Sequence, residues 1–290
     1  MRIGSLCTGY GGLDMAVEAF FNAETIWTCE FDKYASQVIE KRINKHNHGD
    51  LKKTDWTKVE PIDILTAGYP CQPFSHAGSR RGADDERHLW PHIKEIIGIL
   101  RPQFVVLENV RGHFGLGFRE VLGDLASIGY DAKWTLIRAS DVGAPHRRER
   151  LFILANPHRG GSRQQSSISK ALLEHRDSIA QHSNTNGERR TLVTDQSRTK
   201  RNQRQSQSLS CELVQAIYNQ DVPAPLDEGR LNVKFVEYMM GLPSGWVTDC
   251  GLSRSQQLKI LGNGVVPQQA YKALELLNSY PQELCTGHCG

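Results

Sequence analysis

Short apolar runs alternate with segments of helical period through the first 155 residues. Apolar residues recur at helical spacing in residues 13–21 and 34–39, and two more helices are predicted at residues 89–100 and 118–128. Strands are predicted at residues 2–6, 25–30, 62–67, 104–108, 132–137 and 151–155. Continuous apolar strands separated by helices are typical of a doubly wound α/β fold with a mostly parallel sheet.

The character of the chain changes at Asn156. Residues 156–210 hold ten Lys or Arg against four Asp or Glu, a charge of +6, so the rest of the chain sums to −3. The segment is also rich in Ser, Gln, Asn and His, which suits either a solvated insertion or a basic surface for a polyanion. Regular structure is predicted to resume at residues 231–242, and a last helix is predicted at residues 268–277.

The composition limits the class of protein. The 290 residues are 39% hydrophobic and 23% charged, which excludes collagen-like, wholly disordered and membrane-embedded chains. No apolar run reaches the ~18 residues that a membrane span needs, and the first residues lack the pattern of a signal peptide. Seven irregularly spaced cysteines suit free thiols in a reducing compartment, so we expect a cytoplasmic location.

A glycine-rich turn follows the first predicted strand. Gly9, Gly11 and Gly12 stand between that strand and a helix, where a chain can approach a nucleotide-like cofactor closely. Glu30 ends the second predicted strand, 18 residues beyond Gly12, which is where α/β nucleotide sites place a ribose-binding carboxylate. Without the rest of the sequence, Glu30 is equally well explained as a surface acid.

Reactive side chains follow the ends of later strands. Cys71 lies in a Pro- and Gly-rich turn directly after the strand at residues 62–67, a position that suits a nucleophile better than a packed core thiol. Glu108 ends the next strand and is expected to face the same cleft. Arg148 and Arg150 precede the last strand, and their i, i+2 spacing on an extended segment predicts that both point the same way.

In this order, the motifs resemble the DNA cytosine-5 methyltransferases. The matching segments are CTGYGG at the glycine turn, PCQPFS with Cys71, ENV at 108–110, RRER with Arg148 and Arg150, and GNGVVP with Asn263. Residues 235–246, FVEYMMGLPSGW, are similar to the block before that family's last motif. The resemblance covers residues 1–155 and 231–280 and implies a Rossmann-like S-adenosylmethionine-dependent methyltransferase fold with a small target-recognition insert.

The resemblance also implies a reaction, the methylation of C5 of cytosine in double-stranded DNA. The Cys71 thiolate would attack C6 of a flipped-out base, whose extrusion costs a few kcal/mol. Glu108 would hold N3 and the exocyclic amine and donate a proton. Arg148 would contact the base O2 and orient Cys71, while Arg150 would support the loop or its ion pairs.

S-adenosyl-L-methionine is the cofactor that the resemblance implies. Glu30 would bind its ribose, Phe31 would stack on the adenine, and Asp50 would read the adenine amine. The cofactor-binding residues expected in all are Leu6, Thr8, Gly9, Gly11, Gly12, Leu13, Glu30, Phe31, Asp50, Leu51, Pro70, Asn263, Gly264 and Val265. No metal ligand is expected.

The predicted organisation follows from the same motifs. Residues 1–155 and 259–283 would form the catalytic and cofactor-binding domain, residues 156–258 a small target-recognition region, and residues 284–290 a tail. The basic block 156–210 suits contacts with DNA phosphates. The resemblance implies double-stranded DNA as partner, a restriction endonuclease that acts separately, and a monomer.

Two positions depart from the family pattern. Cys7 and Thr8 stand where Phe-Ala is usual, which removes one aromatic contact to the cofactor, and His146 stands where Gln is usual in the motif before the last strand. Neither change removes Cys71, Glu108 or the arginines, so activity is expected.

Two alternatives remain open at this stage. A tRNA cytosine-5 methyltransferase of the same fold typically carries a Cys-Phe-Thr tripeptide, which this chain lacks. A catalytically idle DNA-binding relative would have lost Cys71 or Glu108, and both are present. A dehydrogenase is disfavoured because Gly9, Gly11 and Gly12 do not fit the spacing G-x-G-x-x-G.

Overall fold

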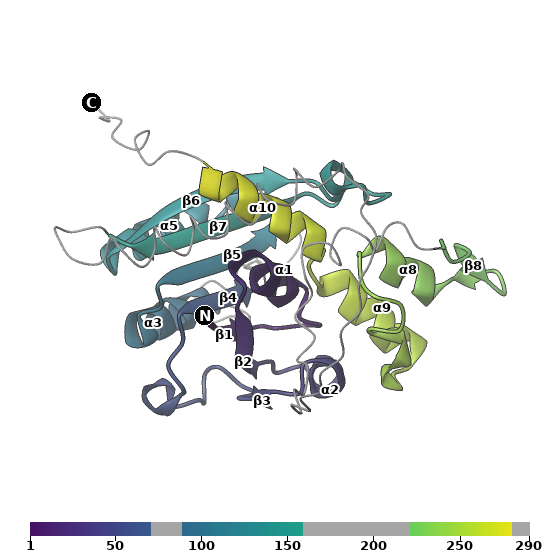
Figure 1. Ribbon diagram of the computed structural model, residues 1–290, viewed down its shortest axis with the longest axis horizontal. Coiled ribbons are helices and arrows are strands. Elements are labelled where there is room, and N and C mark those ends of the chain that lie inside the picture. The colour runs from purple at the N-terminus through teal and green to yellow at the C-terminus, as the bar shows by residue number, and fades with distance from the viewer. Residues whose placement is uncertain (71–88, 159–220, 280–290) are drawn as a thin grey trace, which may run out of the picture. The chain divides into compact units, whose positions relative to one another are not determined.

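The computed structural model of the chain describes residues 1–70, 89–158 and 221–279 (Figure 1). The described residues all belong to one compact unit. Cys71, the basic block 156–210 beyond His158, and the predicted tail at 284–290 lie outside the described residues.

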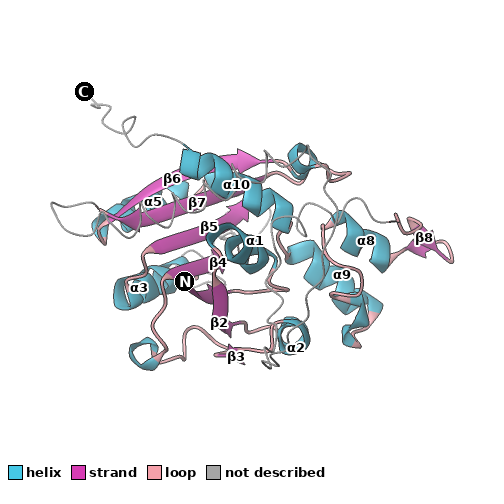
Figure 2. Ribbon diagram, in the orientation of Figure 1, coloured by secondary structure: helices cyan, strands magenta, loops and turns pink. Residues whose placement is uncertain are grey.

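A seven-stranded mixed sheet forms the centre of this unit, in the order β3-β2-β1-β4-β5-β7-β6 (Figure 2). Strands β3, β2, β1, β4 and β5 pair in parallel, whereas β7 runs antiparallel to both β5 and β6. The strands are β1 (Arg2–Leu6), β2 (Glu24–Cys29), β3 (His46–Asn47), β4 (Ile64–Gly68), β5 (Phe104–Val110), β6 (Tyr130–Ile137) and β7 (Arg150–Pro157). The predicted α/β fold with a mostly parallel sheet is therefore confirmed.

Helices cover the sheet on both faces. On one face, α1 (Gly12–Phe21) packs against α10 (Pro267–Ser279), which also contacts β6 and β7. On the other face, α3 (Trp90–Leu100) packs with α5 (Phe118–Ser127) and buries a core against β4, β5 and β7. α2 (Lys33–Arg42) follows β2, and short helices lie at η1 (Trp56–Lys58), α4 (Gly112–Gly115) and η2 (Ala139–Val142).

The C-terminal part of the described chain packs on the glycine turn and α2. It contains the hairpin β8 (Leu226–Asp227) and β9 (Arg230–Leu231), then α8 (Val233–Met239), η4 (Thr248–Cys250) and α9 (Arg254–Asn263). The Trp246 indole donates to the backbone oxygen of Tyr10 over 2.9 Å, and Gln37 of α2 donates to the backbone oxygen of Cys250 over 2.9 Å. Residues 221–258 thus share the compact unit of residues 1–158, and their assignment to DNA recognition stays a prediction.

The ten-residue helix α9 is missing from the sequence-based prediction. No helix was predicted between residues 242 and 268, but α9 occupies Arg254–Asn263, and α10 begins at Pro267. The apolar residues of α9 form no continuous stripe, which is why the periodicity does not reveal this helix. Its capping box of Ser253 and Gln256 was the available signal.

Among the described residues, no helix combines the length and the apolar character needed to cross a bilayer.

Candidate active site

A cavity of about 980 Å³ opens at the edge of the sheet where β1, β2, β4 and β5 end. Open α/β sheets bind their ligands at this edge. All the predicted cofactor-binding residues except Gly11 lie on its wall, and so do Glu108 and Arg150. Arg148 is not among the lining residues. The structure therefore brings most of the predicted residues to one cavity, and their roles stay a prediction.

The glycine turn shapes one wall of the cavity. Gly9 and Gly11 have φ values of 59° and 85°, a left-handed conformation that favours glycine, and Gly11 is the N-terminal cap of α1. A Cβ on Gly12 would lie 2.1 Å from the backbone oxygen of Val265. Gly9, by contrast, has nothing within 4 Å of that position, so its face is open. The glycines allow the turns at 9–12 and 262–265 to meet.

Glu30 closes the turn from the end of β2. One carboxylate oxygen accepts from the Gly9 N–H over 2.9 Å, and the other accepts from the Asp32 N–H over 2.8 Å. Burial raises the pKa of Glu30, although these backbone bonds oppose the shift. Phe31 lies beside it, 77% exposed at the cavity wall. The cavity thus combines a bonded carboxylate with an exposed aromatic ring.

Cys7 replaces an aromatic residue of the family pattern. Its φ is 51°, and the residue lies on the cavity wall. Burial, together with the nearby Glu30 carboxylate, raises the pKa of the Cys7 thiol far above its ordinary value. Cys7 is therefore protonated and unreactive at neutral pH.

Glu108 and Arg150 form a buried ion pair on the opposite side of the cavity. Arg150 Nε lies 2.8 Å from Glu108 Oε1, and the two side chains are 15% and 8% exposed. The antiparallel direction of β7 creates this contact, because its first residue pairs with Val110 at the end of β5. Burial raises the pKa of Glu108 to about 7, although the Arg150 and Arg148 charges lower it. Near neutral pH the Glu108 carboxyl can therefore hold or release a proton.

The prediction that Arg148 and Arg150 share one extended face is wrong. Arg148 precedes β7 and has a φ of 22°, outside the extended region. Its Nη2 donates to the backbone oxygens of Gly262 and Gly264, each over 2.7 Å. Spacing along the sequence could not reveal the left-handed residue that turns the two side chains apart.

His146, the other departure from the family pattern, makes a backbone contact. Its Nε2 lies 2.8 Å from the backbone oxygen of Met239 in α8. Burial lowers the pKa of His146, so the neutral imidazole is favoured in this contact.

Asp14 is a site residue that the sequence reasoning missed. Its carboxylate lines the cavity and accepts from the hydroxyls of Ser5 on β1 and Thr66 on β4. Burial raises the pKa of Asp14 to about 6, and the two hydroxyl bonds only partly offset this. An acid in the first turn of a helix is ordinary in a sequence, so no signal distinguished it.

A second cluster fixes the end of β4. The Tyr69 hydroxyl lies 3.0 Å from Nε2 of the fully buried His113, and Asn109 donates to the Tyr69 backbone oxygen over 3.1 Å. These contacts position Tyr69 and Pro70, the residues that immediately precede Cys71 in the sequence. His113 is not among the residues predicted from the sequence.

Fold and site together define an α/β protein with a cofactor-sized cavity beside Glu108, whose pKa burial raises to about 7. A family model described as C-5 cytosine-specific DNA methylase matches residues 1–160, more than half of the chain. The chain belongs to this family, as the motifs predicted.

Curated relatives match the same part of the chain. The Type II methyltransferase M.BsuFI of Bacillus subtilis is 35% identical over 154 residues, 51% of this chain and 37% of that protein. The Type II methyltransferase M.NgoBI of Neisseria gonorrhoeae is 36% identical over 154 residues, 51% of this chain and 48% of that protein. The matches thus span less than half of these relatives.

Solved structures resemble the whole fold. The Dnmt2 methyltransferase of S. pombe superposes with a TM-score of 0.60 at 16% identity, covering 96% of this chain and 98% of that one. A putative DNA modification methyltransferase encoded within an E. coli prophage gives a TM-score of 0.58 at 18% identity, covering 96% and 99%. These similarities extend the shared fold beyond residue 160.

Proposed function

We propose that this protein methylates C5 of cytosine in double-stranded DNA, with S-adenosyl-L-methionine as the methyl donor. The observation that carries the proposal is a single cavity with a glycine turn and Glu30 on one side and the buried Glu108–Arg150 pair on the other. Family membership supports it.

The cavity fits the proposed cofactor. Its volume of about 980 Å³ suits a ligand of this size. Gly9 presents an open backbone face, Glu30 offers carboxylate oxygens to ribose hydroxyls, and Phe31 offers an exposed ring to the adenine. Asp50 lies on the same wall, where its carboxylate can accept from the adenine amine. When bound, the cofactor supplies an electrophilic methyl group on a sulfonium.

Glu108 and Arg150 would act on the base. A carboxyl with a pKa of about 7 can hold a proton at Oε2 and donate it to N3 as the ring gains electron density. Arg150 orients that carboxyl through Oε1 and carries a positive charge beside the base. Arg150 suits this position because it lines the cavity and pairs with Glu108, whereas Arg148 donates to the turn at residues 262–265.

Cys71 would be the nucleophile, as the family resemblance implies. Its thiolate would add to C6, and C5 would take the methyl group as the S–CH3 bond of the sulfonium breaks. Water would then remove the C5 proton while the C6–S bond breaks and releases the thiolate. The position of Tyr69, two residues before Cys71, supports this role, since His113 contacts its hydroxyl and Asn109 donates to its backbone oxygen. Contacts of residues 156–210 with DNA phosphates, a separately acting endonuclease and a monomeric state stay predictions.

The test is transfer of a tritiated methyl group from S-adenosylmethionine to unmethylated duplex DNA. We expect label on the duplex and none after Cys71→Ser, with a tRNA sample in parallel. Label on tRNA alone would favour the tRNA methyltransferase, and two blank samples with intact cofactor binding would favour the idle relative.

A further inference from the structure

We propose that Arg148 is a positioning residue for the cofactor wall and does not contact the base. This inference rests on the proposed function, because the wall concerned is that of the S-adenosylmethionine cavity. The wall segment is the turn at residues 262–265, at the junction of α9 and α10, and all four of its residues line the cavity.

Arg148 approaches this turn from the side of β7. Its Nη2 donates to the backbone oxygens of Gly262 and Gly264, each over 2.7 Å. Bonds from a charged donor are stronger than those between neutral groups, and a single Arg nitrogen here links two peptide units of one turn. These bonds fix the path of the backbone on either side of Asn263.

Tyr10 holds the same turn from the glycine-rich side. Its hydroxyl donates to the backbone oxygen of Val265 over 2.7 Å, and its ring lies against Gly264. The carbonyls of Gly262, Gly264 and Val265 are therefore all bonded to just two side chains. Asn263, which stands between Gly262 and Gly264, lies on the cavity wall.

The backbone of Arg148 is itself fixed. Gln269 of α10 donates to the Arg148 oxygen over 2.7 Å and to the Ile137 oxygen over 2.6 Å, which joins this segment to the end of β6. Together with the φ of 22°, these bonds direct the Arg148 side chain to the turn while Arg150 points to Glu108. Residues 148–150 thus contact two parts of the cavity wall, the turn at residues 262–265 and Glu108.

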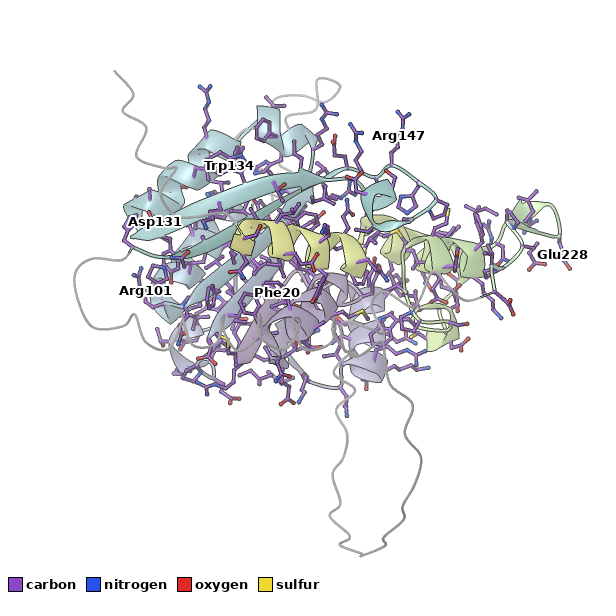
Figure 3. All side chains as sticks on the ribbon, turned by 45° about the horizontal axis from the view of Figure 1, so that its top comes forward. Phe20, Arg101, Asp131, Trp134, Arg147 and Glu228 are labelled. Atoms are coloured by element: carbon purple, nitrogen blue, oxygen red, sulfur yellow. The ribbon has the colours of Figure 1, made fainter. Side chains whose placement is uncertain are left out.

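Arg147 provides a matched control. It is the preceding residue, has the same side chain, and is exposed. Figure 3 shows it pointing outward from the ribbon. Replacing Arg147 removes the same charge from the same segment without touching the turn.

The experiment compares Arg148→Met with Arg147→Met in the full chain. Calorimetric titration with S-adenosylmethionine should give a Kd at least about tenfold higher for Arg148→Met, since two charge-assisted bonds are lost. Arg147→Met should stay within about twofold of the wild type. Filter binding to unmethylated plasmid DNA, in the absence of cofactor, should be the same for both variants.

Further variants keep the test decisive if Arg148→Met does not fold. Arg148→Lys keeps the charge, but its shorter side chain cannot place a nitrogen where Nη2 lies, and Tyr10→Phe removes the hydroxyl that bonds the Val265 backbone oxygen. Both should raise the cofactor Kd and leave DNA binding unchanged. If these folded variants bind the cofactor with the wild-type Kd, the inference is overturned. It is also overturned if they lose DNA binding while cofactor binding is unchanged, because that result is expected of a residue that contacts the base.

Amide hydrogen exchange tests the role of Arg148 without cofactor, so its result does not depend on whether the proposed function is correct. Amides in a peptide covering residues 260–268 should exchange faster in Arg148→Met than in Arg147→Met, with no cofactor present. If the wild type binds no S-adenosylmethionine, the proposed function fails, and this exchange difference alone decides whether Arg148 holds the turn. Equal exchange in the two variants would contradict the inference.

Discussion

Replacing Glu108 with Gln should make the protein less sensitive to alkaline pH. Glu108 has a pKa of about 7 in the folded protein against an ordinary value of 4.5. This difference corresponds to about 3 kcal/mol of unfolding free energy. Because the carboxyl is 8% exposed, solvent screening reduces that figure little.

The folded state binds the Glu108 proton more tightly than the unfolded state does, and this difference sets how stability changes with pH. Below pH 4.5 Glu108 is protonated in both the folded and the unfolded state, so burying its charge costs the fold no stability. Between pH 4.5 and 7 the unfolded chain releases the proton first, so the stability of the fold falls as the pH rises. Above pH 7 the penalty is complete and constant. Gln occupies nearly the same volume and cannot ionise, so it escapes this penalty.

Urea unfolding followed by tryptophan fluorescence at pH 5, 6, 7 and 8 measures the effect. The stability of Glu108→Gln relative to the wild type should rise by up to about 3 kcal/mol from pH 5 to pH 8. Loss of the Arg150 pair shifts the whole curve but leaves its pH dependence readable. The exposed residue Glu120 supplies the control, Glu120→Gln. Parallel curves for Glu108→Gln and the wild type would refute the reasoning.

Three further results are expected. Asp14→Asn should also flatten the fall in stability at rising pH, since Asp14 is buried with a pKa of about 6; the same urea series tests this, and an unchanged slope counts against it. Gly264→Ala should destabilise the fold by about 1–3 kcal/mol, because the new Cβ would lie 1.8 Å from the fully buried Tyr10 ring; wild-type stability would show that the turn yields freely. Tyr69→Phe should cost about 1–3 kcal/mol by leaving Nε2 of His113 without its partner, as thermal unfolding can measure, and no loss would mean another group replaces the hydroxyl.

The strands and most helices could be predicted because their residues are buried in simple patterns. The strand β5 is apolar along most of its length, since both faces of the sheet are covered, and α5 places Phe118, Val121 and Leu125 on one buried stripe. α9 lacks such a stripe and was missed. Its N-terminal Ser253 and Gln256 form a capping box that periodicity does not detect.

The candidate site was predictable to the extent that it depends on strand ends. Gly9, Glu30 and Glu108 follow or end strands, and strand ends of a parallel sheet meet at one edge. The pairing of Glu108 with Arg150 needs the reversed direction of β7, which apolar patterning does not encode. The separation of Arg148 from Arg150 depends on a single left-handed residue, and spacing alone cannot show it.

The most direct test of the central claim follows hydrogen loss from C5. Unmethylated duplex DNA carrying tritium at C5 of cytosine is incubated with the full chain and unlabelled S-adenosylmethionine, and tritium released to water is compared with methyl groups incorporated. We predict one tritium released for each methyl group, with both lost in Cys71→Ser. Methyl incorporation without tritium release, or full activity in Cys71→Ser, would contradict cytosine-5 methylation through Cys71.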